Sequence, residues 1–169
     1  IKEQRRAMKV YVTRILPEAG MEKIRAFAET EVWPDDCPPP REVLMEKVRD
    51  IDGLLCLLTD RIDEELLANA PRLRVVSQMA VGYDNIDVDA CTKRGIRVGN
   101  TPGVLTETTA DLAFALILAA ARRLTEGDRA VRAGKWRTWS PLYMAGQDVH
   151  HATIGIVGMG RIGYEMARR

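Results

Sequence analysis

Short β-type runs alternate with amphipathic helical stretches through residues 8–103. The run at 53–58 is almost wholly apolar, as expected for a strand that is covered on both faces. Alternation of this kind predicts an α/β domain in which helices flank an open parallel sheet. The pattern predicts strands at 9–13, 31–33, 53–58, 74–79 and 96–98, and helices at 17–29, 41–50, 63–69, 87–95, 106–124 and 128–133, with Asp63, Asp87 and Thr106 as N-caps.

An Asn-Thr-Pro-Gly turn at 100–103 ends this alternation, and we place a domain boundary there, giving domains at 8–103 and 104–169. The second part opens with the longest predicted helix. Its stretch 112–121 is apolar all the way round, which is typical of a helix that is buried between two domains or two subunits.

A glycine-rich segment carries the chemistry that the sequence indicates most directly. Residues 153–163 read TIGIVGMGRIG, and a predicted apolar strand at 154–157 leads straight into Gly158-x-Gly160-x-x-Gly163. Gly158 permits a tight turn, Gly160 lets the backbone approach a pyrophosphate, and Gly163 lets the following helix pack closely. The segment therefore predicts a dinucleotide site at a helix N-terminus, although the same spacing also occurs in glycine turns that bind nothing.

Composition and charge narrow the classes of function. The 25 basic and 24 acidic side chains give a net charge of +1, so no basic excess indicates nucleic-acid binding. The three cysteines are far apart and lack Cys-x-x-Cys spacing, so we predict neither a disulfide framework nor a metal site. No apolar run approaches the ~20 residues of a membrane span. We recognise no signal peptide, and we expect a cytoplasmic protein without membrane partners.

Several segments, in this order along the chain, resemble one enzyme family. They read AVGYDNID (80–87), NTPG (100–103), TTADLA (108–113), VRAGKW (131–136) and DVHH followed by the glycine segment (148–163). The combination resembles the D-isomer-specific 2-hydroxyacid dehydrogenases, and most of all the glyoxylate/hydroxypyruvate reductases, including the 2-ketogluconate-reducing branch. The resemblance covers nearly the whole chain from Met8 and identifies it as the N-terminal part of such an enzyme.

The resemblance implies a flavodoxin-like substrate domain, into which a Rossmann dinucleotide-binding domain is inserted. The first predicted domain would be the substrate domain, and the second would hold the truncated beginning of the Rossmann domain. By the same resemblance, the backbone amides of Val81 and Gly82 hold the substrate carboxylate, and Leu57 and Leu58 line the substrate pocket. A glycine-containing turn can present adjacent amides to an anion, so this assignment is physically sensible.

The resemblance also implies a cofactor, NAD(H) or NADP(H), and a homodimer formed through residues 106–149. Thr109 would contact the cofactor on its nicotinamide side. The residues of the pyrophosphate-binding turn would be Gly158, Met159, Gly160, Arg161, Ile162 and Gly163.

The implied reaction is the reduction of a small 2-oxoacid, such as glyoxylate or hydroxypyruvate, to the D-2-hydroxyacid. The catalytic arginine, glutamate and histidine of such enzymes are expected beyond residue 169, so no catalytic residue is assigned and these 169 residues alone are expected to be inactive. His150 and His151 precede the predicted strand, on the side away from a nucleotide site. Alternatives are a 2-ketogluconate reductase, a phosphoglycerate or formate dehydrogenase, and a non-catalytic protein that senses a cofactor or only dimerises.

Overall fold

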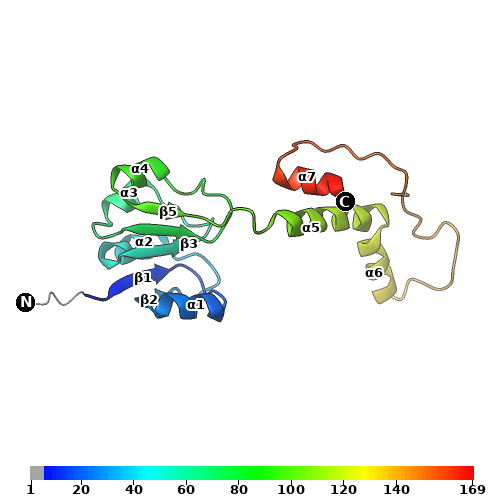
Figure 1. Ribbon diagram of the computed structural model, residues 1–169. Coiled ribbons are helices and arrows are strands. Elements are labelled where there is room, and N and C mark those ends of the chain that lie inside the picture. The colour runs from blue at the N-terminus through cyan, green and yellow to red at the C-terminus, as the bar shows by residue number, and fades with distance from the viewer. Residues whose placement is uncertain (1–5) are drawn as a thin grey trace, which may run out of the picture. The chain divides into compact units, whose positions relative to one another are not determined.

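The computed structural model describes residues 6–169, and the chain divides into two compact units between Gly103 and Val104. A β-sheet with its helices makes up the first unit, and three helices with their loops make up the second (Figure 1). Within the described residues, no helix combines the length and the apolar character that crossing a membrane requires.

A five-stranded parallel sheet forms the centre of the first unit and confirms the predicted α/β class. The strand order is β2-β1-β3-β4-β5, which is the flavodoxin-like order. In such sheets, ligands bind outside the carboxyl ends of the strands, where the order reverses between β1 and β3. The strands are β1 (Met8–Val12), β2 (Ala28–Val32), β3 (Gly53–Cys56), β4 (Val75–Gln78) and β5 (Arg97–Gly99).

The helices that follow β2, β3 and β4 cover one face of this sheet. The buried side chains of Tyr11, Leu54 and Val76, on the three central strands, form one cluster with apolar residues of the helices that follow β2, β3 and β4. The opposite side of β4 is more open, since Val75 is 39% exposed and lines, with Gly53, a cavity of about 420 Å³. The helices of this unit are α1 (Glu18–Arg25), α2 (Arg41–Lys47), a 3₁₀ turn (Val48–Asp50), α3 (Glu64–Ala68) and α4 (Val88–Lys93).

Two of the predicted caps are confirmed. Asp63 accepts a hydrogen bond from the backbone amide of Leu66 at 3.1 Å, and Asp87 accepts one from the amide of Ala90 at 2.8 Å. Each carboxylate satisfies an amide that has no partner within its helix, and each negative charge lies at the positive end of that helix.

The prediction was wrong between residues 17 and 33. The helix ends at Arg25 rather than at residue 29, and the second strand covers 28–32 rather than 31–33. Ala28 is buried as the first residue of β2, where it pairs with Met8 of β1. The apolar pattern of this segment is helical, but the hydrogen bonds of a full parallel ladder with β1 determine its conformation. This is a tertiary effect.

The second unit holds α5 (Thr106–Ala121), α6 (Leu124–Arg132) and α7 (Arg161–Arg168). Thr106 is not the N-cap that we predicted, because α5 is capped by Leu105, without a side-chain hydrogen bond. The helix predicted at 128–133 begins four residues earlier, directly after Arg123, which has the left-handed φ of 54° that separates α6 from α5. Within the described residues α5 is not buried on every side, since Leu112 and Leu116 are 61% and 60% exposed.

The strand predicted at 154–157 does not form. This segment has no regular secondary structure, and Val157 at its end is fully exposed. A parallel strand exists only by hydrogen bonding to a neighbour, and residues 104–169 contain no strand that could pair with it.

Candidate functional site

The loop after β3 and the turn after β4 lie at one edge of the sheet, because the carboxyl ends of parallel strands share an edge. Leu57 and Leu58 follow β3, and Val81 and Gly82 follow β4. A Cβ atom on Gly82 would lie 3.9 Å from Cδ2 of Leu58, and the side chains of Leu58 and Val81 are 58% and 42% exposed. The structure therefore brings the predicted carboxylate-binding turn and an exposed apolar side chain together.

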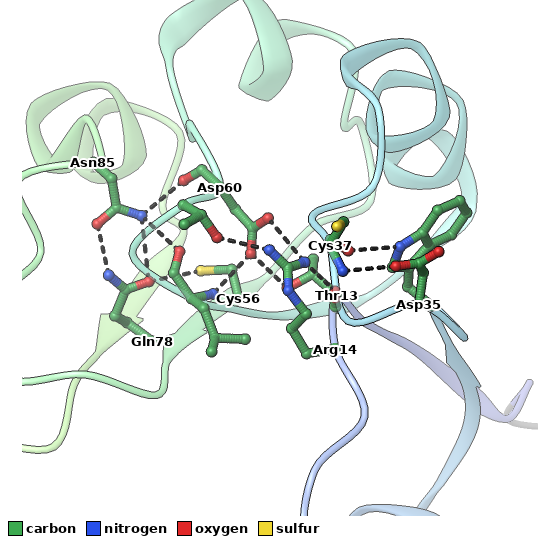
Figure 2. Close-up of polar contacts among 11 residues, drawn as sticks. Thr13, Arg14, Asp35, Cys37, Cys56, Asp60, Gln78 and Asn85 are labelled. Carbon is green, nitrogen blue, oxygen red and sulfur yellow. Dashed lines mark hydrogen bonds and ion pairs between the residues drawn. The ribbon is translucent and has the colours of Figure 1, made fainter. Parts of the chain in front are cut away.

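Two side-chain amides tie these loops to each other, as Figure 2 shows. Asn85 donates through Nδ2 to the carbonyl oxygens of Asp60 at 2.7 Å and Leu57 at 3.1 Å. Gln78, only 1% exposed, donates through Nε2 to Oδ1 of Asn85 at 2.6 Å and to the carbonyl oxygen of Gly82 at 3.2 Å. Neither residue is predicted as functional from the sequence. The strand that ends in Gln78 reads VVSQ, and no pattern in it marks this glutamine as functional.

A buried carboxylate completes this edge on the side of β1 (Figure 2). Oδ2 of Asp60 accepts hydrogen bonds from Oγ1 of Thr13 at 2.5 Å and from the amide of Leu57 at 2.8 Å. Nη1 of Arg14 lies 3.7 Å from Oδ1 of Asp60, and the two side chains are 10% and 1% exposed. Charges this deeply buried are tolerated when they are paired and hydrogen-bonded. The cluster therefore fixes the loop that contains Leu57 and Leu58.

Two further buried groups beside this edge keep their protons. Burial, reinforced by the charges of Glu31 and Asp60, raises the pKa of the Tyr11 hydroxyl to about 12. Burial, followed by the charge of Asp60, raises the pKa of the Cys56 thiol to about 12, and this thiol donates to Oε1 of Gln78 at 3.1 Å. Both groups are neutral at physiological pH, so Cys56 is no nucleophile there.

The glycine segment in the second unit forms a turn that leads into α7. Gly158 has a φ of +95°, which side-chain-bearing residues rarely adopt. Gly160 is the N-cap of α7, and a Cβ atom there would meet nothing within 4 Å. A Cβ atom on Gly163 would overlap the carbonyl oxygen of Gly158. The first glycine is thus needed for the turn and the third for packing, and the side of the second glycine is open.

The geometry of this turn fits an anionic group. Tyr164 is the first residue whose amide bonds back into the helix, to the carbonyl oxygen of Gly160 at 2.9 Å. The preceding amides of Arg161, Ile162 and Gly163 have no helical partner, and they lie at the positive end of α7. The side chain of Met159, in the same turn, is 63% exposed. Unpaired amides at a helix start can hold a pyrophosphate, and the open side of Gly160 leaves room for one beside them.

Thr109 lies in the first turns of α5, which packs against α7. Arg169 joins the two helices, because its side chain bonds to Asp111 and donates to the carbonyl oxygen of Glu107 at 3.0 Å. The side chain of Thr109 is exposed and makes no hydrogen bond within residues 6–169. Thr109 therefore belongs to the same unit as the glycine turn, with its hydroxyl accessible.

Within the described residues, the two histidines are not arranged with other side chains as a catalytic group would be. His150 and His151 pack edge to face, with ring centroids 5.1 Å apart, and both are exposed. The only carboxylate paired with either ring is Asp148, 3.7 Å from Nε2 of His150, among the residues that the structure covers. Those residues also contain no cluster of histidine, cysteine or acidic side chains that could hold a metal ion.

Comparison with known proteins identifies one family that this chain matches. The profile of the family described as "D-isomer specific 2-hydroxyacid dehydrogenase, catalytic domain" matches residues 10–162. A glyoxylate reductase of Korarchaeum cryptofilum is 59% identical over 95% of this chain and 49% of its own length. A glyoxylate reductase of Thermococcus litoralis is 55% identical over 95% of this chain and 50% of its own length. The chain thus spans about half the length of the curated relatives that it matches.

Solved structures agree with this assignment. The TT0316 protein of Thermus thermophilus is similar with a TM-score of 0.91 at 44% identity, over 95% of this chain and 52% of that protein. An NADPH-dependent glyoxylate/hydroxypyruvate reductase of Sinorhizobium meliloti, solved with NADP and malonate, is similar with a TM-score of 0.71 at 29% identity. That similarity covers 96% of this chain and 50% of the reductase.

Proposed function

The chain belongs to the D-isomer specific 2-hydroxyacid dehydrogenase family, and on that premise we propose that the complete protein reduces a small 2-oxoacid, such as glyoxylate or hydroxypyruvate, to the D-2-hydroxyacid with NADH or NADPH. The similarity to proteins named glyoxylate reductase, at 52–59% identity, supports this substrate class. In the reaction, one hydride from the reduced nicotinamide and one proton convert the carbonyl to an alcohol, leaving oxidised nicotinamide.

Residues 8–103 would bind the 2-oxoacid. The observation that carries this proposal is the turn of Val81 and Gly82, which lies beside the exposed Leu58 at the carboxyl edge of the sheet. Backbone amides can hold a carboxylate, and the apolar side chains of Leu57 and Leu58 would limit the size and polarity of the group next to it. Small 2-oxoacids meet both requirements.

Residues 104–169 would contribute the beginning of the cofactor site. The open space beside Gly160 and the free amides of Arg161, Ile162 and Gly163 support the binding of a dinucleotide pyrophosphate. The accessible hydroxyl of Thr109 suits a contact with the cofactor on its nicotinamide side. The arginine, glutamate and histidine implied by the family resemblance would complete the reaction from positions beyond residue 169.

A substrate panel with the complete protein tests the proposal. Oxidation of NADH and of NADPH would be followed by the loss of nicotinamide absorbance with glyoxylate, hydroxypyruvate, 2-ketogluconate and 3-phosphohydroxypyruvate. We expect the highest kcat/KM with glyoxylate or hydroxypyruvate. A preference for 2-ketogluconate or for the phosphorylated substrate would reassign the protein to another branch. Absence of turnover by a folded protein that still binds the dinucleotide would favour the non-catalytic alternative.

We also propose that the complete protein is a homodimer through residues 106–149. Helix α5 supports this because Leu112 and Leu116, one turn apart, are both about three-fifths exposed. Trp139 and Leu142 in the loop after α6 are 78% and 84% exposed. Sedimentation equilibrium should give twice the chain mass, and Leu116→Glu should shift it toward the monomer. Ile15→Glu, at a 62% exposed site outside this region, is the matched control and should leave the mass unchanged.

A further inference from the structure

Three consecutive carbonyl groups of the turn after β4 are held by the protein itself. The carbonyl oxygen of Ala80 accepts the backbone amide of Thr101 at 2.9 Å. The carbonyl oxygen of Val81 accepts Nδ2 of Asn100 at 2.7 Å, and that of Gly82 accepts Nε2 of Gln78. Two of these three donors belong to the Asn-Thr-Pro-Gly turn, which the proposed function leaves without a role.

These bonds determine where the amides of the turn point. The described peptide bonds are all trans, so each N–H points away from the carbonyl of its own peptide unit. The carbonyls of Ala80 and Val81 point to residues 100–101, and the amides of Val81 and Gly82 therefore point to the opposite side. Neither amide donates to a protein oxygen within residues 6–169. Two adjacent amides directed to the same side form an anion-binding nest.

Because residue 82 is glycine, the backbone itself does not fix the orientation of the peptide unit between Val81 and Gly82. A peptide unit followed by glycine can rotate as a whole at little steric cost, since glycine also tolerates positive φ. Rotation of the unit between Val81 and Gly82 would turn its amide inward and direct its carbonyl oxygen toward a bound carboxylate. The hydrogen bond from Asn100 to the carbonyl of Val81 is broken by that rotation, so it stabilises the amide-outward state.

We propose that Asn100 is a positioning residue for the substrate carboxylate, because its side chain holds the carbonyl of Val81 and thereby directs the amide of Gly82 toward the ligand. This inference rests on the proposed function and deepens it. Thr101 and Gln78 hold the neighbouring peptide units in the same way, through a backbone amide and a buried side chain. Asn100 is the best position for a test, because its hydrogen bond is exposed and its replacement leaves no buried charge.

The test uses Asn100→Asp in the complete protein. Aspartate has the same shape but cannot donate to the carbonyl of Val81. The KM for glyoxylate and the Kd for oxamate, an unreactive 2-oxoacid analogue, should each rise about tenfold, the effect of about one well-placed hydrogen bond. The Kd for the nicotinamide cofactor should remain within about twofold and kcat within about threefold, the pattern for loss of uniform binding. Asn100→Ala should show the same split with a smaller rise.

Asn69→Asp is the matched control. Nδ2 of Asn69 donates to the carbonyl oxygen of Glu65 at 2.9 Å, which is the same kind of exposed hydrogen bond at the far end of α3. This variant should bind glyoxylate and oxamate like the unmodified protein. If both Asn100 variants leave these constants unchanged, or if they weaken cofactor binding equally, the inference is overturned. Calorimetry with oxamate needs no turnover, so a protein that binds oxamate without reducing any 2-oxoacid refutes the proposed reaction separately.

Discussion

A Cβ atom on Gly163 would overlap the carbonyl oxygen of Gly158, because the first turn of α7 packs directly onto the residue that opens the glycine turn. The nearest side-chain atom, on Ile156, would be 3.5 Å away and easily accommodated. The added Cβ would therefore meet a backbone atom, which cannot move aside as a side chain can. The turn and the helix hold their relative positions only with glycine at residue 163.

Gly163→Ala should therefore lower both stability and cofactor affinity. Relieving the overlap requires displacement of the turn or of the start of α7, and such overpacking costs about 1–3 kcal/mol. We expect a lower melting temperature for the complete protein and a KM for NAD(P)H at least about tenfold higher, because the amides at the helix start are displaced with it. Thermal unfolding and steady-state kinetics provide the measurements. An unchanged melting temperature would show that the packing is looser than the structure indicates.

Gly160→Ala should weaken cofactor binding without lowering the stability of the protein. A Cβ atom at residue 160 meets no protein atom within 4 Å, and the φ of −76° suits alanine. The melting temperature should therefore stay the same or rise slightly. The methyl group would occupy the space that we propose for the pyrophosphate, so the KM for the cofactor should rise about tenfold while the KM for the 2-oxoacid changes little. Equal cofactor affinity for this variant and the unmodified protein would place the pyrophosphate elsewhere.

Much of the fold follows from patterns that are local in the sequence. The apolar run around Leu54 and the acidic caps Asp63 and Asp87 depend on neighbours within a few residues, and they form as predicted. The segment around Ala28 does not follow its own periodicity, because its conformation is decided by pairing with β1, twenty residues earlier in the chain. The strand predicted at 154–157 fails for the same reason, since its hydrogen-bonding partners must come from elsewhere.

The candidate site is predictable to a similar extent. The glycine spacing indicated the tight turn at Gly158, and the structure gives this residue the positive φ that glycine tolerates best. Asn85 and Gln78 gave no such signal. Asn85 contacts Leu57 across 28 positions of sequence, and no local pattern indicates which carbonyl a distant amide will reach. Polar residues of this kind are recognised only when the strand ends are placed side by side.

The buried pair of Asp60 and Arg14 gives a stability prediction. Asp60→Ala should lower the free energy of unfolding by about 3–5 kcal/mol, because it leaves the guanidinium of Arg14 buried without its partner. Asp60→Asn keeps an oxygen that can accept from the amide of Leu57 and should cost less. Chemical denaturation of the complete protein measures both. Asp128→Ala is the control, since it removes an exposed pair with Arg132, and it should change little. Equal effects of Asp60→Ala and Asp128→Ala would contradict the buried pairing.

The three cysteines should differ sharply in reactivity, because alkylation requires the thiolate. With a pKa of about 12, only about one Cys56 in ten thousand is ionised at pH 8, and the thiol is buried as well. Burial also raises the pKa of Cys91, whereas Cys37 is exposed. Iodoacetamide at pH 8 should therefore label Cys37 in the folded protein and label all three in denaturant, as peptide mapping by mass spectrometry would detect. Because the raised pKa favours the protonated form, labelling of Cys56 should stay slow up to about pH 10. Rapid labelling of Cys56 at pH 8 would show that the edge of the sheet around Gln78 opens in solution.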